Sequence, residues 1–350
     1  MTDYKQMQVR QDTSARWKAL NPTLLSGEYG LATDTKELKI GDGVTPWNNL
    51  LSITGEADIA EQIARGIYKG QDLAVKFAGE ISSGNYSSVF AWLHARIQAR
   101  NYAGIYPGDY FYAQCSAGTV GGQAVAAVNR KCTIAGIELY RMCGDSEPLM
   151  RNHITVYAGN TGENVQWNGV NNNNGTEDNP CPWKASKLYA LLNGVDNAGS
   201  NVGGNVGYDA SAGGYLQLFP EELQGYMVEQ RIYMDKRYSS TAVLTENNGN
   251  EWQGRGKLFV PSEIEMYGHP IFSAGSTGSN NNAARGPYCQ FPIFKTAGDA
   301  GRFLYGRAGL WLSSVSEGSS ANACNVNYNG NASQNNTSNT GRAPLCFHMS

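Results

Sequence analysis

Residues 309–347 read GLWLSSVSEGSSANACNVNYNGNASQNNTSNTGRAPLCF and contain two very different kinds of sequence. Apolar runs at 309–315 and 343–349 have the length and composition of adjacent buried strands. The 24 residues between them, 318–341, include no charged residue and no Leu, Ile or Phe. A long polar segment that is held at both ends by core strands is more often a binding surface than a free tail. We therefore predict a binding surface at about 316–341.

Asparagine dominates this polar segment, together with serine, glycine and tyrosine. These residues hydrogen-bond in many geometries and cost little to order, as adaptable binding loops require. We predict that exposed side chains of the segment contact a partner molecule. The candidate contacts are Ser319, Ser320, Asn322, Asn325, Asn327, Tyr328, Asn329, Asn331, Asn335, Asn336 and Asn339.

The remainder of residues 85–350 predicts a mixed α+β domain with few helices and many loops. Helices are expected after Ser87 or Ser88, from Pro182 to Gly194, and from Pro220 onward, because a cap or an N-terminal proline precedes an apolar periodicity there. Further strands are expected at 104–113, 131–142, 257–261 and 290–294. Gly- and Asn-rich insertions at 169–179 and 197–214 add length without a predicted role.

The composition excludes several classes of protein. Glycine accounts for 42 of the 350 residues and charged residues for only 16%, so helical bundles and coiled-coil rods are excluded for most of the chain. A net charge of −3 provides no basic field that would gather nucleic acid. We find no long apolar run and no apolar core of a secretion signal near residue 1. We expect synthesis in a cytoplasm, without membrane insertion.

The pattern of reactive residues predicts neither catalysis nor a metal site. The seven cysteines are odd in number and form no CxxC pair, so we expect buried thiols. Glu263 and Glu265 would share a face of a strand, but the favoured role for Glu263 is bonding to the backbone. The run TEDN at 176–179 is the most suggestive one for calcium. We expect no catalytic residue, no metal and no cofactor. The histidines, which lack ligand spacing, are His94, His153, His269 and His348.

Residues 1–55 predict brief strands joined by tight turns, with Asp34 and Asp42 ending turns. A unit with so little core is expected to oligomerise. Isoleucines at 59, 63 and 67 recur every four positions, which favours a short linker helix within 56–84 that Gly66 and Gly70 weaken. This helix would pack on its copies in an oligomer or dock on the domain that follows.

The first 50 residues resemble the N-terminal domain of phage tail-fibre tip proteins of the major tropism determinant type. The resemblance covers about one seventh of the chain and implies a small intertwined β-prism in a homotrimer, attached to other phage tail proteins. It rests on Arg16 and Trp17, NPTLLSGEYG (21–30), TDT (33–35) and KIGDGVTPWNNL (39–50).

Residues 85–350 resemble the C-type-lectin-like variable domains of phage proteins that retroelements diversify, a fold related to formylglycine-generating enzymes. The matching motifs are FVPSEIEMYG (259–268), GLWLSSV (309–315) and GRAPLCF (341–347). The family places its diversified, receptor-contacting positions between the last two motifs. Asparagine codons begin with two adenines, and the mutagenesis of this family is directed at adenines. The asparagine-rich run therefore resembles a template repeat that has barely been altered, which would be the parental version of the binding site. The insertions between 144 and 255 depart from the family, and loop positions there are not carried over.

The resemblances imply a receptor-binding protein at the tip of a phage tail fibre, located in the virion, that binds a protein or glycan on the bacterial surface. Weak contacts in a homotrimer would add up through avidity. Two alternatives remain: a structural fibre or baseplate component without receptor contact, and a formylglycine-generating type of oxidase. The oxidase would need a late cysteine pair, for which Cys324 and Cys346 are the only candidates.

Overall fold

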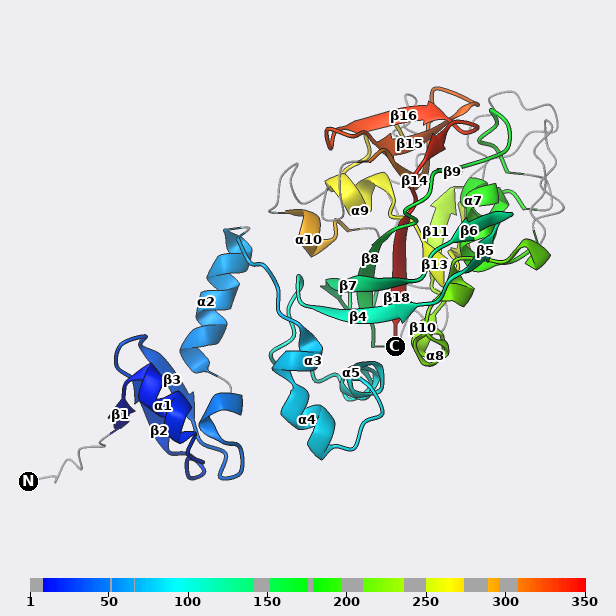
Figure 1. Ribbon diagram of the computed structural model, residues 1–350. Coiled ribbons are helices and arrows are strands. Elements are labelled where there is room, and N and C mark those ends of the chain that lie inside the picture. Colours follow the sequence, from blue (N-terminus) through cyan, green and yellow to red (C-terminus); the bar gives the residue numbers. More distant parts are fainter. Residues whose placement is uncertain are drawn as a thin grey trace, which may run out of the picture.

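The computed structural model describes residues 9–50, 52–65, 67–141, 152–175, 179–196, 210–235, 250–273, 289–295 and 308–350. Within these residues the chain is a mixed α and β structure, built mainly from strands with few and short helices (Figure 1). The mixed architecture predicted from the sequence is therefore confirmed. Among the described helices, none has the length and apolar character that crossing a bilayer requires.

The N-terminal unit is a three-stranded sheet covered by two short helical segments. Its first two strands are parallel and its last two antiparallel. The elements are β1 (Arg10–Asp12), α1 (Ser14–Leu20), β2 (Tyr29–Ala32), β3 (Glu37–Ile40) and the 3-10 helix η1 (Trp47–Asn49).

Two stacked tryptophans form the centre of this unit. The rings of Trp17 and Trp47 lie 4.1 Å apart between centroids, and both are buried. The indole N–H of Trp17 donates to the Leu31 carbonyl, so the ring is fixed in orientation as well as buried. This cluster is separate from the core of the rest of the chain, and Leu24, Ala32 and Leu50 complete it. The unit thus has a small core of its own.

The segment 56–84, expected as a linker helix, is divided in the structure. α2 (Ile53–Ala64) follows the N-terminal unit, whereas α3 (Leu73–Lys76) and α4 (Ala78–Ser83) come after an extended stretch. Gly70 lies in this stretch at φ +72°, and a Cβ atom there would meet the Gly108 carbonyl oxygen at 1.8 Å. Leu73 and Phe77 pack into the large core. The second half of the segment therefore docks on the domain that follows.

The large core is organised around an antiparallel sheet of six strands, in which β8 and β18 are central and buried along their whole length. Its order is β10-β18-β8-β7-β4, and β13 also pairs with β18. The predicted strands at 131–142, 257–261 and 343–349 are confirmed with shifted or shorter bounds. The members are β4 (Tyr110–Cys115), β7 (Val128–Ile137), β8 (Ile154–Asn160), β10 (Met227–Val228), β13 (Leu258–Phe259) and β18 (Pro344–Met349).

Short helices cover this sheet, and two of them correct the sequence prediction. α5 (Val89–Gln98) begins at the Ser88 cap as expected. The strand expected at 290–294 is instead α10 (Pro292–Lys295), because proline suits the first turn of a helix and has no N–H for a sheet. Residues 263–267 form α9 rather than a strand. The remaining helices are α6 (Pro182–Ala185), α7 (Lys187–Asn193), α8 (Glu221–Tyr226) and α9 (Glu263–Tyr267).

The helix expected over 182–194 is divided at Ser186. The hydroxyl of Ser186 accepts the Tyr189 N–H and caps α7, which ends at Gly194 in the left-handed conformation as predicted. Smaller two-stranded and 3-10 elements complete the fold. They are β5 (Gly118–Val120), β6 (Gln123–Val125), β9 (Val165–Gln166), η3 (Ala210–Ala212), η4 (Leu216–Leu218), β11 (Arg231–Asp235), β12 (Asn250–Gly254) and β17 (Thr340–Gly341).

Candidate functional site

The polar segment 318–341 is folded as part of a sheet. β14 (Leu310–Val315), β15 (Asn322–Val326) and β16 (Ala332–Asn336) form an antiparallel three-stranded sheet. In Figure 1 it lies at the end of the molecule remote from the N-terminal unit. We call residues 322–336 the hairpin. The prediction of a polar excursion between two strands is thus sharpened, because most of the excursion is itself strand.

The turn of the hairpin is fixed by one asparagine. The side-chain oxygen of Asn327 accepts the backbone N–H groups of Asn329 and Asn331. The Gly330 carbonyl in turn accepts the hydroxyl of Tyr267 on α9, at 3.0 Å. An Asx turn of this kind holds its loop from within, and the Tyr267 contact joins it to α9. Asn327 therefore serves the turn, while Tyr328 beside it has 65% of its surface exposed.

One face of this sheet carries a small cavity. Trp311, Asn325 and Ser333 are direct cross-strand neighbours, and residues opposite one another share a face. The cavity has a volume of about 260 Å³, and we call it the hairpin pocket. Its lining residues are Gly309, Trp311, Asn325, Asn327, Tyr328, Ser333, Asn335, Thr340 and Gly341.

The floor of the hairpin pocket is rigid. Trp311 is buried, as the sequence predicted, and its indole N–H donates to the Val165 carbonyl at 2.9 Å. A Cβ atom on Gly341 would lie only 3.2 Å from the indole nitrogen. The absence of a side chain there lets β17 approach the tryptophan closely. At Gly309 a Cβ atom would meet nothing closer than 4.0 Å, so that position opens into space.

A second asparagine-rich stretch holds the hairpin from behind. We call residues 168–174 the asparagine loop. The side-chain amide of Asn173 donates to the carbonyl oxygens of Ser319 and Asn322 at 2.5 and 2.6 Å, and its backbone N–H donates to Ser320. Asn173 is fully buried. Its contacts therefore fix the backbone that leads into β15.

Thr337 makes the second connection between the asparagine loop and the end of β16. It is fully buried, and its hydroxyl donates to the Val170 carbonyl and accepts the Asn172 N–H. Its backbone N–H donates to Ala321. This role of the asparagine loop could not be predicted from the sequence, because the loop has the same composition as the hairpin. Only burial separates the structural asparagines from the exposed ones.

The predicted contact residues fall into three groups, and Tyr328 belongs to two of them. Tyr328, Asn329, Asn331, Asn336 and Asn339 are exposed. Asn325, Asn327, Tyr328 and Asn335 line the hairpin pocket. Ser319, Ser320 and Asn322 are half-buried beside the asparagine loop, and the Ser319 hydroxyl accepts the Ala321 N–H.

Two family models match this chain. Residues 149–348, which are more than half of the chain, match the model described as Domain of unknown function (DUF6273). The chain belongs to this family. Residues 7–45 match the model described as the major tropism determinant N-terminal domain, which confirms the resemblance of the N-terminal residues. Neither the curated proteins nor the solved structures include a match to the chain.

The region matched by the DUF6273 model contains the asparagine loop, the hairpin and the hairpin pocket. It also contains Glu263 and Glu265, which were expected to share a face of a strand. Glu263 is buried and accepts the backbone N–H groups of Ile271, Phe272 and Ser273. The backbone-bonding role predicted for it is confirmed. Glu265 forms the capping box of α9 with Ser262.

The cysteine pair that an oxidase would need is buried. Cys324 lies on β15 and Cys346 on β18, both without solvent exposure. Burial raises the pKa of the Cys346 thiol well above its ordinary value. Because the thiolate is the reactive form, this environment suppresses cysteine chemistry.

Histidines and carboxylates form no metal site in the described residues. The structure brings together His153 and His348, whose rings are 5.6 Å apart, although no spacing in the sequence relates them. Burial lowers the pKa of His348 well below its ordinary value. Within the described ranges, no three His, Cys, Asp or Glu side chains are grouped to hold a metal. Residues 176–178 of the TEDN run lie outside those ranges.

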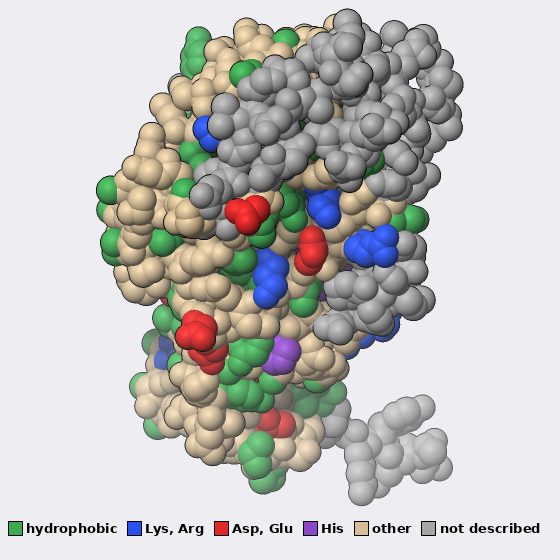
Figure 2. Space-filling view, turned by 90° about the vertical axis from the view of Figure 1, so that its right-hand side faces the viewer, with side chains coloured by type: hydrophobic (Ala, Val, Ile, Leu, Met, Phe, Trp, Pro, Cys, Tyr) green, Lys and Arg blue, Asp and Glu red, His purple; other side chains and the backbone are tan. Residues whose placement is uncertain are grey.

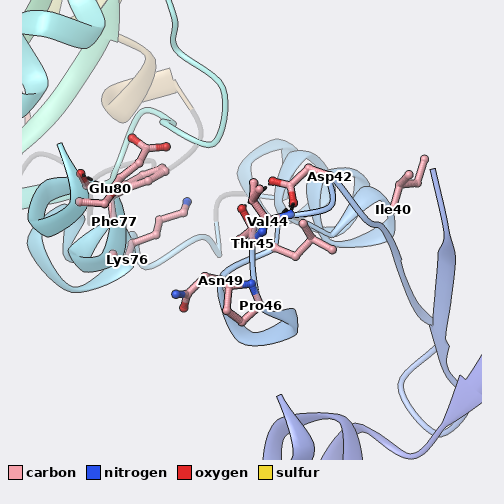
Figure 3. Close-up of a pocket in the computed structure, with 12 residues that line it drawn as sticks. Ile40, Asp42, Val44, Thr45, Pro46, Asn49, Lys76, Phe77 and Glu80 are labelled. Carbon is pink, nitrogen blue, oxygen red and sulfur yellow. Dashed lines mark hydrogen bonds between the residues drawn. The ribbon is translucent and has the colours of Figure 1, made fainter. Parts of the chain in front are cut away.

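A larger cavity of about 590 Å³ lies between the N-terminal unit of this DUF6273 family member and α3 and α4. Figure 3 shows Asp42 and Thr45 on one side and Lys76, Phe77 and Glu80 on the other. The charged groups here already have partners in the chain: Asp42 accepts from Thr45, Glu80 pairs with Arg96, and the Lys76 ammonium donates to the Gly104 carbonyl. We therefore place the candidate site at the hairpin pocket.

Asp42 ends its turn as predicted. Its titration tests whether hydrogen bonds from Thr45 stabilise that turn. The side-chain and backbone hydrogen bonds of Thr45, followed by that of the Val44 N–H, lower the pKa of Asp42 to about 2. A lowered pKa stabilises the turn above the ordinary pKa of 3.8, and that stabilisation is lost as the pH falls toward 2. Thr45→Val should raise the pKa of Asp42 toward 3.8 in an NMR titration. An unchanged value would show that the hydroxyl does not matter.

Proposed function

We propose that this protein is a tail-fibre tip protein of a bacteriophage that determines host range by binding the bacterial surface through the hairpin. The observation that carries the proposal is the match of residues 7–45 to the major tropism determinant N-terminal domain. It supports a tail protein of the tropism type, carried in the virion and attached to other tail proteins. The N-terminal unit would take the form of a β-prism.

The hairpin supports the location of the receptor site. Its exposed side chains are held on a backbone that buried groups fix from behind, namely Asn173, Thr337 and Trp311. Substituting the exposed positions would therefore change the surface and leave the core intact. This is the arrangement that retroelement diversification would exploit, on a scaffold of the C-type-lectin type. The protein would act by binding and not as an enzyme.

The uncharged lining of the hairpin pocket also supports recognition by contact. Figure 2 shows one face of the molecule, on which acidic and basic side chains are scattered and form no patch of one sign. The hairpin pocket has no charged lining residue. Uncharged contacts that are individually weak gain strength from several linked copies. We therefore include a homotrimer, assembled through the N-terminal unit, in the proposed function.

Alanine substitution of four exposed residues, three in the hairpin and Asn339 just after it, tests the receptor site. The variant Asn329→Ala, Asn331→Ala, Asn336→Ala, Asn339→Ala should lower binding of the purified chain to cells of the phage host at least tenfold. Its melting temperature should stay within about 2 °C, because exposed substitutions usually cost little. Asn164→Ala, at an exposed position outside the hairpin, is the matched control. Cell binding equal to that of the unsubstituted chain would contradict the proposal.

Light scattering tests the homotrimer. A mass equal to that of one chain at micromolar concentration would contradict the trimer.

A further inference from the structure

The hairpin pocket has the size of a site for one small ring. Its volume of about 260 Å³ lies just below the range of roughly 300–1,000 Å³ that is typical of small-molecule pockets. A protein partner would instead use a surface of about 800 Å² on each side. Gly309 and Gly341 form part of the wall with their backbone alone. Because they have no side chains, the space that a larger residue would occupy belongs to the cavity.

The chemistry of the lining excludes a charged occupant. Asparagine, serine, threonine, tyrosine and tryptophan supply all the side chains, and none of them carries a charge at neutral pH. An ion that entered the pocket would lose water without gaining a counter-charge, which is costly. The occupant that fits this lining is neutral.

The pocket also contains an acceptor that needs a donor. The side-chain oxygen of Asn325 is buried, and no hydrogen bond reaches it within the described part of the chain. A buried acceptor without a partner costs about 1–3 kcal/mol. Asn335, Ser333 and Thr340 add further amide and hydroxyl groups to the wall. A ligand with several hydroxyl groups can donate to the first oxygen when the Asn325 amide turns toward the cavity, and it can bond to the others.

Tyr328 provides an apolar surface at the same pocket. It lines the cavity and exposes 65% of its surface. Aromatic rings with a polar tip combine contact area with hydrogen bonding. A ligand ring with C–H groups on its faces can pack on Tyr328. Hydroxyl groups on the edge of the same ring can bond to the amides of the pocket wall.

We propose that the hairpin pocket binds a single neutral sugar ring of a cell-surface glycan. The proposal rests on the function proposed above, since it names the chemical class of the receptor group that the hairpin contacts. Hydroxyl groups of the sugar donate to Asn325 and bond to Asn335, Ser333 and Thr340, and Tyr328 covers one face of the ring.

Ligand-observed NMR on the full chain tests this proposal. The probes are the methyl glycosides of glucose, galactose, mannose and N-acetylglucosamine, with glucuronate and N-acetylneuraminate as anionic counterparts. At least one neutral glycoside should bind, and the anionic sugars should not. Binding of no neutral glycoside, or equal binding of the anionic ones, would overturn the proposal.

Two variants test the place of binding. Gly309→Leu fills the pocket from a position with open space, and Asn325→Asp adds a carboxylate of nearly the same shape. Each should weaken glycoside binding at least tenfold. The melting temperature of Gly309→Leu should change little, whereas Asn325→Asp also costs stability because its carboxylate is buried. Asn164→Asp, an exposed change of the same chemistry outside the pocket, should bind within twofold of the unsubstituted chain. Undiminished binding by both pocket variants would place the sugar elsewhere and refute the proposal.

Treatment of host cells separates this proposal from the proposed function. Periodate cleaves sugars with neighbouring hydroxyls, and protease removes surface proteins. Loss of chain binding after periodate supports the sugar site. Loss only after protease overturns the sugar site and leaves the receptor-binding function in place, with a protein receptor. Absence of binding to untreated host cells would instead count against the proposed function.

Discussion

Asn173→Asp should lower the free energy of unfolding by about 3 kcal/mol or more and abolish binding through the hairpin. The substitution replaces an amide donor, which bonds to the carbonyl oxygens of Ser319 and Asn322, by a carboxylate oxygen. Three oxygen acceptors would then face one another in a site without solvent exposure. Denaturant unfolding and cell binding measure the two effects.

Asn171→Asp is the matched control for this prediction. Asn171 lies two residues away in the same asparagine loop, but it is exposed and its side-chain oxygen accepts from the N–H and hydroxyl of Ser338. An aspartate keeps that acceptor, so its unfolding free energy should change by less than about 0.5 kcal/mol. Equal effects of the two substitutions would mean that burial at Asn173 is not the cause.

Arg255→Met should destabilise the large core by about 3–5 kcal/mol. The Arg255 guanidinium forms two bonds with the Glu265 carboxylate, at 2.7 and 2.8 Å, and both side chains are buried. The Tyr140 hydroxyl donates to the same carboxylate, and the guanidinium lies over the Phe259 ring. Removing the arginine leaves a buried carboxylate without its counter-charge. Thermal and urea unfolding measure the loss.

The exposed pair of Arg65 and Glu61 provides the comparison. Its nitrogen and oxygen are also 2.7 Å apart, but more than half of each side chain is exposed. Arg65→Met should therefore cost less than about 1 kcal/mol. The double variant Arg255→Met, Glu265→Gln should recover part of the loss, because no unpaired charge remains. If Arg255→Met were as mild as Arg65→Met, the buried pair would not hold the core.

The sequence predicted correctly those helix and strand boundaries that depend on neighbouring residues in the chain. Ser88 and Gly194 mark helix ends through a side-chain acceptor and a left-handed backbone, and both occur as expected. The strands at 310–315 and 344–349 coincide with apolar runs that have the length of buried strands. The error at Pro292 arose because a short apolar run fits a helix or a strand equally well.

The sequence by itself determined the two-part character of the chain, with an N-terminal unit of the tropism-determinant type and an uncharged segment pinned between two buried strands. It could not decide which asparagines touch a partner. Asn173 and Asn329 are the same residue in similar surroundings of sequence, yet one is buried behind the hairpin and the other exposed at its turn. Tertiary structure alone made that distinction, because the carbonyl groups that Asn173 serves lie some 150 residues away along the chain. A side chain's role depends on partners that only folding brings to it.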